Sequence, residues 1–260
     1  MSRVAAVRMA AWLVLGFLVL PMLVVVPVSL TDQRFLSLPE ERVSLQHYRA
    51  LWENALWSGA ILRSFLCAAA ATLLALALGV PSAVAFWRIA SRLGEVLRIL
   101  VLLPIVVPGI VSAVALYRHL ARLGLVDTYA GVVLAHTLTS LPFVMIAASA
   151  SLANMDARLE RAARGLGAGR WQTLWWVTLP QIRPGILAGA ALAFVSAWDE
   201  TVVTLFITGL NVYLLPRAIW DGIRDNVDPA IAAVATLMIL ATALGLLAEG
   251  WLRRRRGPQP

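Results

Sequence analysis

Long apolar stretches alternate with shorter polar segments along the whole chain. Six such stretches occur, and they cover about residues 4–30, 59–86, 99–117, 129–152, 185–209 and 230–252. A helix needs about 20 apolar residues to cross the hydrocarbon core of a bilayer, and each stretch comes close to that length or exceeds it. The pattern therefore predicts an all-α integral membrane protein with six transmembrane helices in a single domain over residues 1–260.

Prolines interrupt several of these stretches. Pro21 and Pro27 lie in the first, and Pro104, Pro108 and Gly109 lie close together in the third. Proline removes a helical hydrogen bond and clashes with the preceding turn, so we expect kinks at these positions. Hinges and static kinks both fit the pattern, because irregular backbone in a membrane is tolerated where neighbouring helices or a water-lined path satisfy it.

The charges support a membrane topology. The chain is 60% hydrophobic and only 14% charged, with a formal net charge of +8. The basic residues are spread between the apolar stretches, so they fit membrane orientation better than nucleic-acid binding. Most of the arginines lie in segments that the six spans would place on the same side of the membrane as the N-terminus. We therefore expect both termini and the connection over residues 153–184 to be cytoplasmic.

The longest amphipathic, arginine-rich segment covers residues 159–180, between the fourth and fifth apolar stretches. Leu159, Ala162, Ala163 and Leu166 have the spacing i, i+3, i+4, i+7. This spacing places them on one face of a helix. The face is apolar and made of small and medium side chains, so it could enter a cleft on another protein.

The rest of this segment predicts a second short helix and its ends. Gly167 is expected to end the first helix, and the second begins at Arg170. Pro180 is expected to break the chain before the fifth span. Glu160 lies off the apolar face of the first helix, and we expect it to face solvent.

Two interpretations of residues 159–180 stay open on pattern alone. The segment could dock on a soluble partner, or it could rest on the lipid headgroups. Trp171, Trp175 and Trp176 would serve as interfacial anchors in the second case.

The fifth stretch contains an acidic pair, Asp199 and Glu200, near its middle. A carboxylate inside a bilayer is costly and usually faces a bundle interior or a water-filled path. With Trp198 and Thr201 beside them, the two acids could line a translocation pathway for a cationic amine through charge and cation–π contact. The alternative is a structural pair with His136 or with an arginine of a partner subunit. Adjacent helical residues differ by about 100° in direction, and we favour Asp199 as the one that faces the pathway.

The sequence contains no G-x-x-x-x-G-K-[ST], HExxH or GxSxG motif, and its one cysteine, Cys67, lies in an apolar stretch. We therefore expect no nucleotide site, no metal cluster and no catalytic site on this chain.

The motif spacing in the 159–180 segment resembles the EAA loop of ABC-importer permeases. In this chain Ala162-Ala163 is followed by three residues, Gly167, nine residues and then Val177-Thr178-Leu179-Pro180. Two positions depart from the family pattern: Arg161 stands where the motif has Glu, and Val177 replaces Ile. The resemblance implies a type I importer permease whose loop inserts into a groove of a cytoplasmic ATPase. The coupling-loop residues so implied are Glu160, Arg161, Ala162, Ala163, Gly167, Leu179 and Pro180.

Further stretches, among them LPIVVPGIV, AHTLTSLPFV and SAWDETVVTLFITG, resemble the C-type permease of spermidine/putrescine transporters. This resemblance implies an ATPase dimer that binds the ATP and Mg²⁺, a second, related permease in a heterodimer, and an extracytoplasmic solute-binding protein. The implied solute is a polyamine or a related cationic amine. The rival function is a secondary carrier or channel driven by an ion gradient, with Asp199, Glu200 and His136 as its proton relay.

Overall fold

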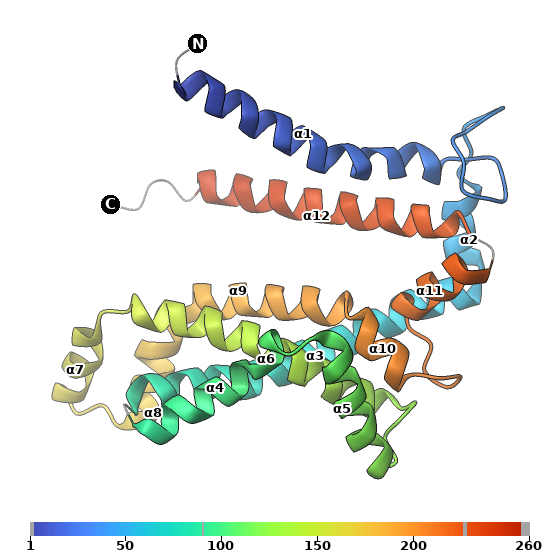
Figure 1. The fold of residues 1–260 in the computed structure, drawn as a ribbon. Coiled ribbons are helices and arrows are strands. Elements are labelled where there is room, and N and C mark those ends of the chain that lie inside the picture. The colour runs from blue at the N-terminus through green and yellow to red at the C-terminus, as the bar shows by residue number, and fades with distance from the viewer. Residues whose placement is uncertain (1–2, 90, 226–227, 256–260) are drawn as a thin grey trace. The chain divides into compact units, whose positions relative to one another are not determined.

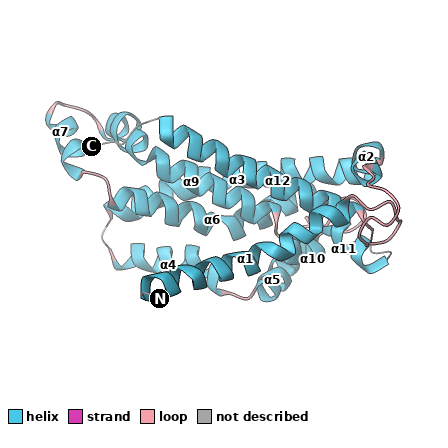
Figure 2. Cartoon of the chain, turned by 90° about the horizontal axis from the view of Figure 1, so that it is seen from above, coloured by secondary structure: helices cyan, strands magenta, loops and turns pink. Residues whose placement is uncertain are grey.

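The computed structural model describes residues 3–89, 91–225 and 228–255, and every regular element in these ranges is a helix (Figures 1 and 2). In chain order the helices are α1 (Arg3–Ser29), α2 (Gln46–Glu53), α3 (Ala55–Arg88), α4 (Arg92–Val106), α5 (Gly109–Arg122), α6 (Tyr129–Ala153), α7 (Ala157–Gly165), α8 (Arg170–Thr173), the π-helical turn η1 (Leu174–Thr178), α9 (Leu179–Trp198), α10 (Thr201–Ile207), α11 (Leu215–Asp225) and α12 (Ala230–Arg255). They form two compact units, residues 1–59 with 218–260, and residues 60–217.

The helices confirm the all-α membrane architecture but do not reproduce the predicted spans one for one. Four helical segments are long and apolar enough to cross a membrane, namely Val7–Ser29, Ala55–Arg88, Tyr129–Ala153 and Arg170–Trp198. The pair α4 and α5 counts as a fifth span if its bent halves are taken together. The predicted sixth span lies in α12, whose apolar part within the described residues is the shorter segment Ala230–Leu244.

The break predicted in the third apolar stretch is confirmed. Helices α4 and α5 meet at an angle of 110°. Val107 is extended between them, with φ −74° and ψ 129°, because the ring of Pro108 disfavours the helical conformation of the residue before it. Pro108 then precedes the first turn of α5, where its missing N–H costs no helical bond.

The centre of the 60–217 unit is formed by α3, α6 and α9. Val80 and Val84 from α3, Val144 and Leu152 from α6, and Ile182 from α9 share one buried apolar cluster. Helices α6 and α9 run side by side in this unit (Figure 1). Small residues line their contact, as is common where membrane helices approach closely.

The glycines of α9 make that contact possible. A Cβ at Gly185 would lie 2.4 Å from Ser151 Cβ and 2.7 Å from the carbonyl oxygen of Ala147. A Cβ at Gly189 would lie 3.1 Å from Val144 Cα. The glycines are four residues apart and so occupy one helical face.

The predicted limits of the fifth span were wrong at both ends. The helix begins at Leu179 rather than near residue 185, and Pro180 does not break the chain. It lies at the start of α9, directly after the π-helical turn η1, and the helical backbone runs on through it, since the Leu179 N–H donates to the carbonyl oxygen of Leu174. The helix ends at Trp198, and the separate short helix α10 follows.

In the other unit, α12 packs against α1 and α2. The hydroxyls of Ser29 and Tyr48 are 2.6 Å apart and join the end of α1 to α2. This unit also contains His47, a buried residue whose Nε2 is 3.1 Å from the carbonyl oxygen of Gln33.

Candidate functional site

The segment over residues 159–180 forms the predicted helix, bend and helix. Asp156 caps α7, because its Oδ1 accepts a hydrogen bond of 2.8 Å from the Arg158 N–H. The bend is at Gly167, whose φ of +90° lies in the left-handed region that glycine adopts at little cost. Helix α8 begins at Arg170, as expected, and the side chain of Gln172 accepts a hydrogen bond of 2.8 Å from the Gly169 N–H.

This loop presents apolar side chains to its surroundings. Leu166 is 91% exposed and Trp176 is 81% exposed. A shallow hollow of about 490 Å³ lies between the two short helices and is lined by Ala163, Leu166, Gly167, Ala168, Gln172, Trp176 and Val177. Exposed apolar groups around a hollow are typical of a surface that another molecule covers.

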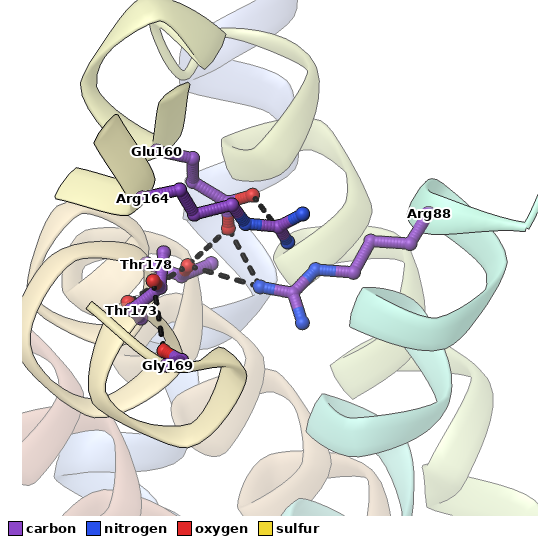
Figure 3. Close-up of polar contacts among 6 residues, drawn as sticks. All are labelled: Arg88, Glu160, Arg164, Gly169, Thr173 and Thr178. Carbon is purple, nitrogen blue, oxygen red and sulfur yellow. Dashed lines mark hydrogen bonds and ion pairs between the residues drawn. The ribbon is translucent and has the colours of Figure 1, made fainter. Parts of the chain in front are cut away.

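Glu160 does not face solvent, contrary to the prediction. The residue is 7% exposed, and its carboxylate points toward the end of α3 (Figure 3). Oε1 accepts a hydrogen bond of 2.7 Å from Arg88 Nη2 and another from the Thr178 hydroxyl. Arg164 Nη2 lies 3.8 Å from Oε2. Helical periodicity within residues 159–166 could not show that α3 ends beside them.

These partners keep Glu160 ionised. Burial raises the pKa of its carboxyl, but hydrogen bonds from Thr178 and Arg88 and the charges of Arg88 and Arg164 outweigh it, so the pKa is lowered from its ordinary value. A carboxylate with a lowered pKa stabilises the fold above the ordinary pKa of glutamic acid. That stability is lost as the pH falls through the lowered pKa.

The other predicted loop residues lie in different surroundings. Arg161 and Ala162 are exposed, and Ala163 is half-buried. Leu179 packs against the cluster of α3, α6 and α9, and Pro180 is exposed in the first turn of α9. The loop thus has an outer face and an inner face, and Arg161 belongs to the outer one.

The two predicted intramembrane acids lie at a helix break rather than inside a helix. Asp199 is the C-cap residue of α9, and it is exposed. Glu200 is half-buried and caps α10, because its Oε1 accepts a hydrogen bond of 3.1 Å from the Val203 N–H. The Thr201 hydroxyl lies 3.2 Å from the carbonyl oxygen of Asp199. The Glu200 carboxylate is therefore used in a capping hydrogen bond, whereas the Asp199 carboxylate makes no such bond among the described residues.

Three aromatic rings lie beside this break. Trp198 stacks on Phe194, with ring centroids 5.9 Å apart and planes inclined by 24°. Phe65 of α3 meets both rings edge-on, at 5.5 Å from Phe194 and 6.4 Å from Trp198. The sequence indicated Trp198, but it gave no sign that Phe65 would join it from another helix.

His136 is held by a hydroxyl rather than by a carboxylate. Its Nε2 lies 3.1 Å from Thr204 Oγ1, and the residue is buried between α6 and α10. The Thr204 hydroxyl also donates a hydrogen bond of 2.5 Å to the carbonyl oxygen of Glu200. His136 therefore joins α10 to α6 near the break, although not through the predicted carboxylate–histidine pair.

Residues 7–257 match the family described as the binding-protein-dependent transport system inner membrane component. This chain belongs to that family. It is a permease subunit of an ABC importer, a multi-pass protein of the inner membrane, and not an enzyme. Permeases of this kind work with an ATPase and a solute-binding protein.

Two curated relatives of this permease differ in what their names say they carry. The molybdenum transport system permease protein ModB of Mycobacterium tuberculosis is 36% identical over 226 residues, which cover 80% of this chain and 84% of ModB. The spermidine/putrescine transport system permease protein PotC of Haemophilus influenzae is 29% identical over 250 residues, which cover 96% of this chain and 97% of PotC.

A solved structure shares the fold of this permease. The match is to a crystal structure of a bacterial ABC transporter involved in the import of the acidic polysaccharide alginate. The TM-score is 0.65 at 16% sequence identity, with 99% of this chain and 100% of the other covered. At this identity the likeness shows the fold alone.

One residue that sequence reasoning missed in this permease is Asp127. Its carboxylate accepts hydrogen bonds from four consecutive backbone N–H groups, those of Gly209, Leu210, Asn211 and Val212, at 2.6–3.0 Å. The residue has φ +56°, which aspartate tolerates better than most residues. Burial raises the pKa of its carboxyl, but the four hydrogen bonds together lower the pKa by more, so it lies below its ordinary value. Asp127 thereby fixes the α5–α6 turn to the segment after α10.

Proposed function

We propose that this permease moves a small cationic amine of the polyamine class, delivered by a binding protein and driven by ATP hydrolysis on a cytoplasmic ATPase dimer. The observation that carries the solute assignment is the break between α9 and α10. There an exposed carboxylate, Asp199, follows directly on a cluster of three aromatic rings.

A cationic amine suits this arrangement chemically. Asp199 offers charge-assisted hydrogen bonds to an ammonium group, and the faces of Trp198 and Phe194 attract a cation through their quadrupoles. A break in a membrane-spanning helix is tolerated where the backbone lines a cavity or is covered by protein. Substrate sites in several transporter folds are built at such discontinuous helices.

The alternative solute is an oxyanion such as molybdate, and the 36% identity to ModB favours it. A helix N-terminus binds anions through its free N–H groups. In this chain, however, the Glu200 carboxylate already occupies that position in α10, and Asp199 adds a second negative charge beside it. The PotC relative also matches over nearly the full length of both chains. These observations together support the amine.

The loop over residues 159–180 is proposed to be the contact with the ATPase, and the coupling loop extends over 153–184. The exposed Leu166 and Trp176 and the hollow between the short helices support docking over resting on headgroups, because a lipid surface needs no hollow. Both termini are then cytoplasmic. A second, related permease completes a heterodimer, and the binding protein meets the opposite face at segments 31–57 and 210–228. ATP and Mg²⁺ belong to the ATPase.

Asp199→Asn tests the solute assignment. The change keeps the size of the side chain and removes its charge, so uptake of spermidine or putrescine by the reconstituted importer is expected to fall by about tenfold or more, as loss of a charge-assisted hydrogen bond predicts. Glu200→Gln is the matched control, because its amide oxygen can still accept the Val203 N–H bond, and a smaller loss is expected. Uptake of radiolabelled amine into proteoliposomes measures both.

Unchanged amine uptake in both variants would show that the two acids have a structural role and do not bind the solute. Uptake of molybdate but not of amine by the unaltered importer would contradict the amine assignment and favour the oxyanion. Equal elution of both variants and the unaltered chain on size exclusion shows that assembly is intact.

A further inference from the structure

Arg88 is the last residue of α3 and the point where that helix meets the 159–180 loop. Its Nη2 donates a hydrogen bond of 2.7 Å to Glu160 Oε1, across 72 residues of sequence. The Arg49–Glu53 and Arg164–Glu160 pairs lie within single helices and are i,i+4 contacts. The Arg88–Glu160 pair, by contrast, joins the coupling loop to a membrane helix.

The Glu160 carboxylate is the junction of a continuous polar network (Figure 3). It accepts from Arg88 and from the Thr178 hydroxyl, which lies 3.3 Å from the carbonyl oxygen of Thr173. The Thr173 hydroxyl in turn donates to the carbonyl oxygen of Gly169 at 3.0 Å. One carboxylate therefore links α3 to both short helices of the loop and to the π-helical turn that leads into α9.

Both members of the pair are largely covered. The Arg88 side chain is 25% exposed and the Glu160 side chain is 9% exposed. An ion pair on an open surface contributes little. Removing Glu160 leaves Arg88 without this counter-ion in a poorly solvated place, and removing Arg88 leaves Glu160 with only the longer 3.8 Å pair to Arg164. The contact is therefore expected to persist while the loop moves.

Helix α3 leads from this pair to the proposed solute pathway. Phe65, which contacts Trp198 beside Asp199, lies 23 residues before Arg88 on the same helix, or roughly 35 Å at 1.5 Å per residue. Between them α3 packs tightly on α6, since a Cβ at Gly79 would lie 2.9 Å from Val144 Cγ1. A displacement at Arg88 thus acts on the same helix that contributes Phe65 to the aromatic cluster.

We propose that the Arg88–Glu160 ion pair couples the loop to the membrane helices: it transmits movement of the loop to α3, and through α3 to the aromatic cluster. Arg88 and Glu160 are positioning residues: they lie behind the loop's exposed face, and they act by tying that face to the membrane helices. This proposal rests on the proposed function of the loop as the ATPase contact. It does not depend on which solute is carried.

The test uses the full importer in proteoliposomes, with Arg88→Gln and Glu160→Gln. Each variant is expected to retain the ATPase on co-purification, because the exposed face is unchanged. ATP hydrolysed per solute imported is expected to rise by roughly tenfold, within the usual range of coupling between sites. The double variant is expected to be no worse than either single variant, as for two residues that act through one contact. Arg92→Gln, at an exposed arginine that begins α4, is the matched control.

A wild-type ratio of ATP to solute in either glutamine variant would overturn the proposal, and so would loss of ATPase co-purification, which would make the pair part of the docking surface. If the glutamine variants do not assemble, Glu160→Asp keeps the charge on a shorter side chain and is expected to raise the ratio by a smaller factor. A wild-type ratio there overturns the proposal equally. Failure of the proposed function would look different, because the unaltered importer itself would then lack ATPase binding or ATP-driven uptake.

Discussion

Gly185→Val is expected to loosen the packing of α9 against α6 and to lower the unfolding temperature of the permease well below that of the unaltered chain. A Cβ at this position would meet Ser151 Cβ at 2.4 Å and the carbonyl oxygen of Ala147 at 2.7 Å. The second of these is backbone, so no change of rotamer can relieve the overlap. Overpacking of this kind costs about 1–3 kcal/mol or more, and α6 and α9 pack against each other closely.

Thermal unfolding of the detergent-solubilised permease, followed by size exclusion, measures this effect. Gly16→Val is the matched control, since a Cβ at Gly16 in α1 has no described atom within 4 Å. The control is expected to unfold near the wild-type temperature, and Gly185→Val well below it. Equal unfolding temperatures for the two variants would show that α6 and α9 are not held together at Gly185.

Gly167→Val is expected to abolish coupling between the permease and its ATPase while leaving the membrane helices folded. Gly167 has φ +90°, and a Cβ there meets no described atom within 4 Å, so the cost is purely one of backbone conformation. Left-handed backbone costs an L-residue about 1–2 kcal/mol, and a β-branched residue suffers most. The bend between α7 and α8 would open and distort the face that carries Leu166 and Trp176.

Co-purification of the ATPase and ATP hydrolysis stimulated by loaded binding protein measure this second effect. Because about 1.4 kcal/mol corresponds to a tenfold change in affinity, a loss of tenfold or more is expected. Gly165→Val serves as control, because Gly165 lies two residues earlier in the helical backbone of α7 and also has open space around its Cβ position. Normal coupling in Gly167→Val would mean that the shape of the bend does not matter for docking.

The sequence predicted best where the signal is local and repeated. Apolar length indicated an all-α membrane protein, the Pro104–Pro108 cluster indicated the bend of 110° between α4 and α5, and Gly167 indicated the bend of the loop. These features depend on proline sterics, on glycine in the left-handed region and on the cost of polar backbone in lipid. Each can be recognised from a few neighbouring residues.

The misses concern contacts between distant segments. Glu160 was assigned to solvent because its own helix places it off the apolar face, whereas Arg88, 72 residues earlier, covers it. Asp127 was passed over as an ordinary loop residue, although it binds four N–H groups more than 80 residues later. Single-helix periodicity contains no information about such partners.

The break at Asp199 and Glu200 shows a third kind of miss. Apolar composition alone extended the fifth span to residue 209, and the acidic pair was placed in its middle. In the structure the Glu200 carboxylate caps α10 by accepting the Val203 N–H, although Glu is not among the residues that favour an N-cap position. The break therefore had no capping signature in the sequence.

ATP hydrolysis on a partner, acting through the 159–180 loop, is proposed to drive transport by this permease. The most direct test is solute uptake into proteoliposomes that contain this permease and its paired permease, with the binding protein outside and the ATPase and ATP inside. Uptake is expected to require both the ATPase and ATP and to stop in Gly167→Val. Uptake driven by an ion gradient alone, with no ATPase present, would contradict it and would support the relay of Asp199, Glu200 and His136.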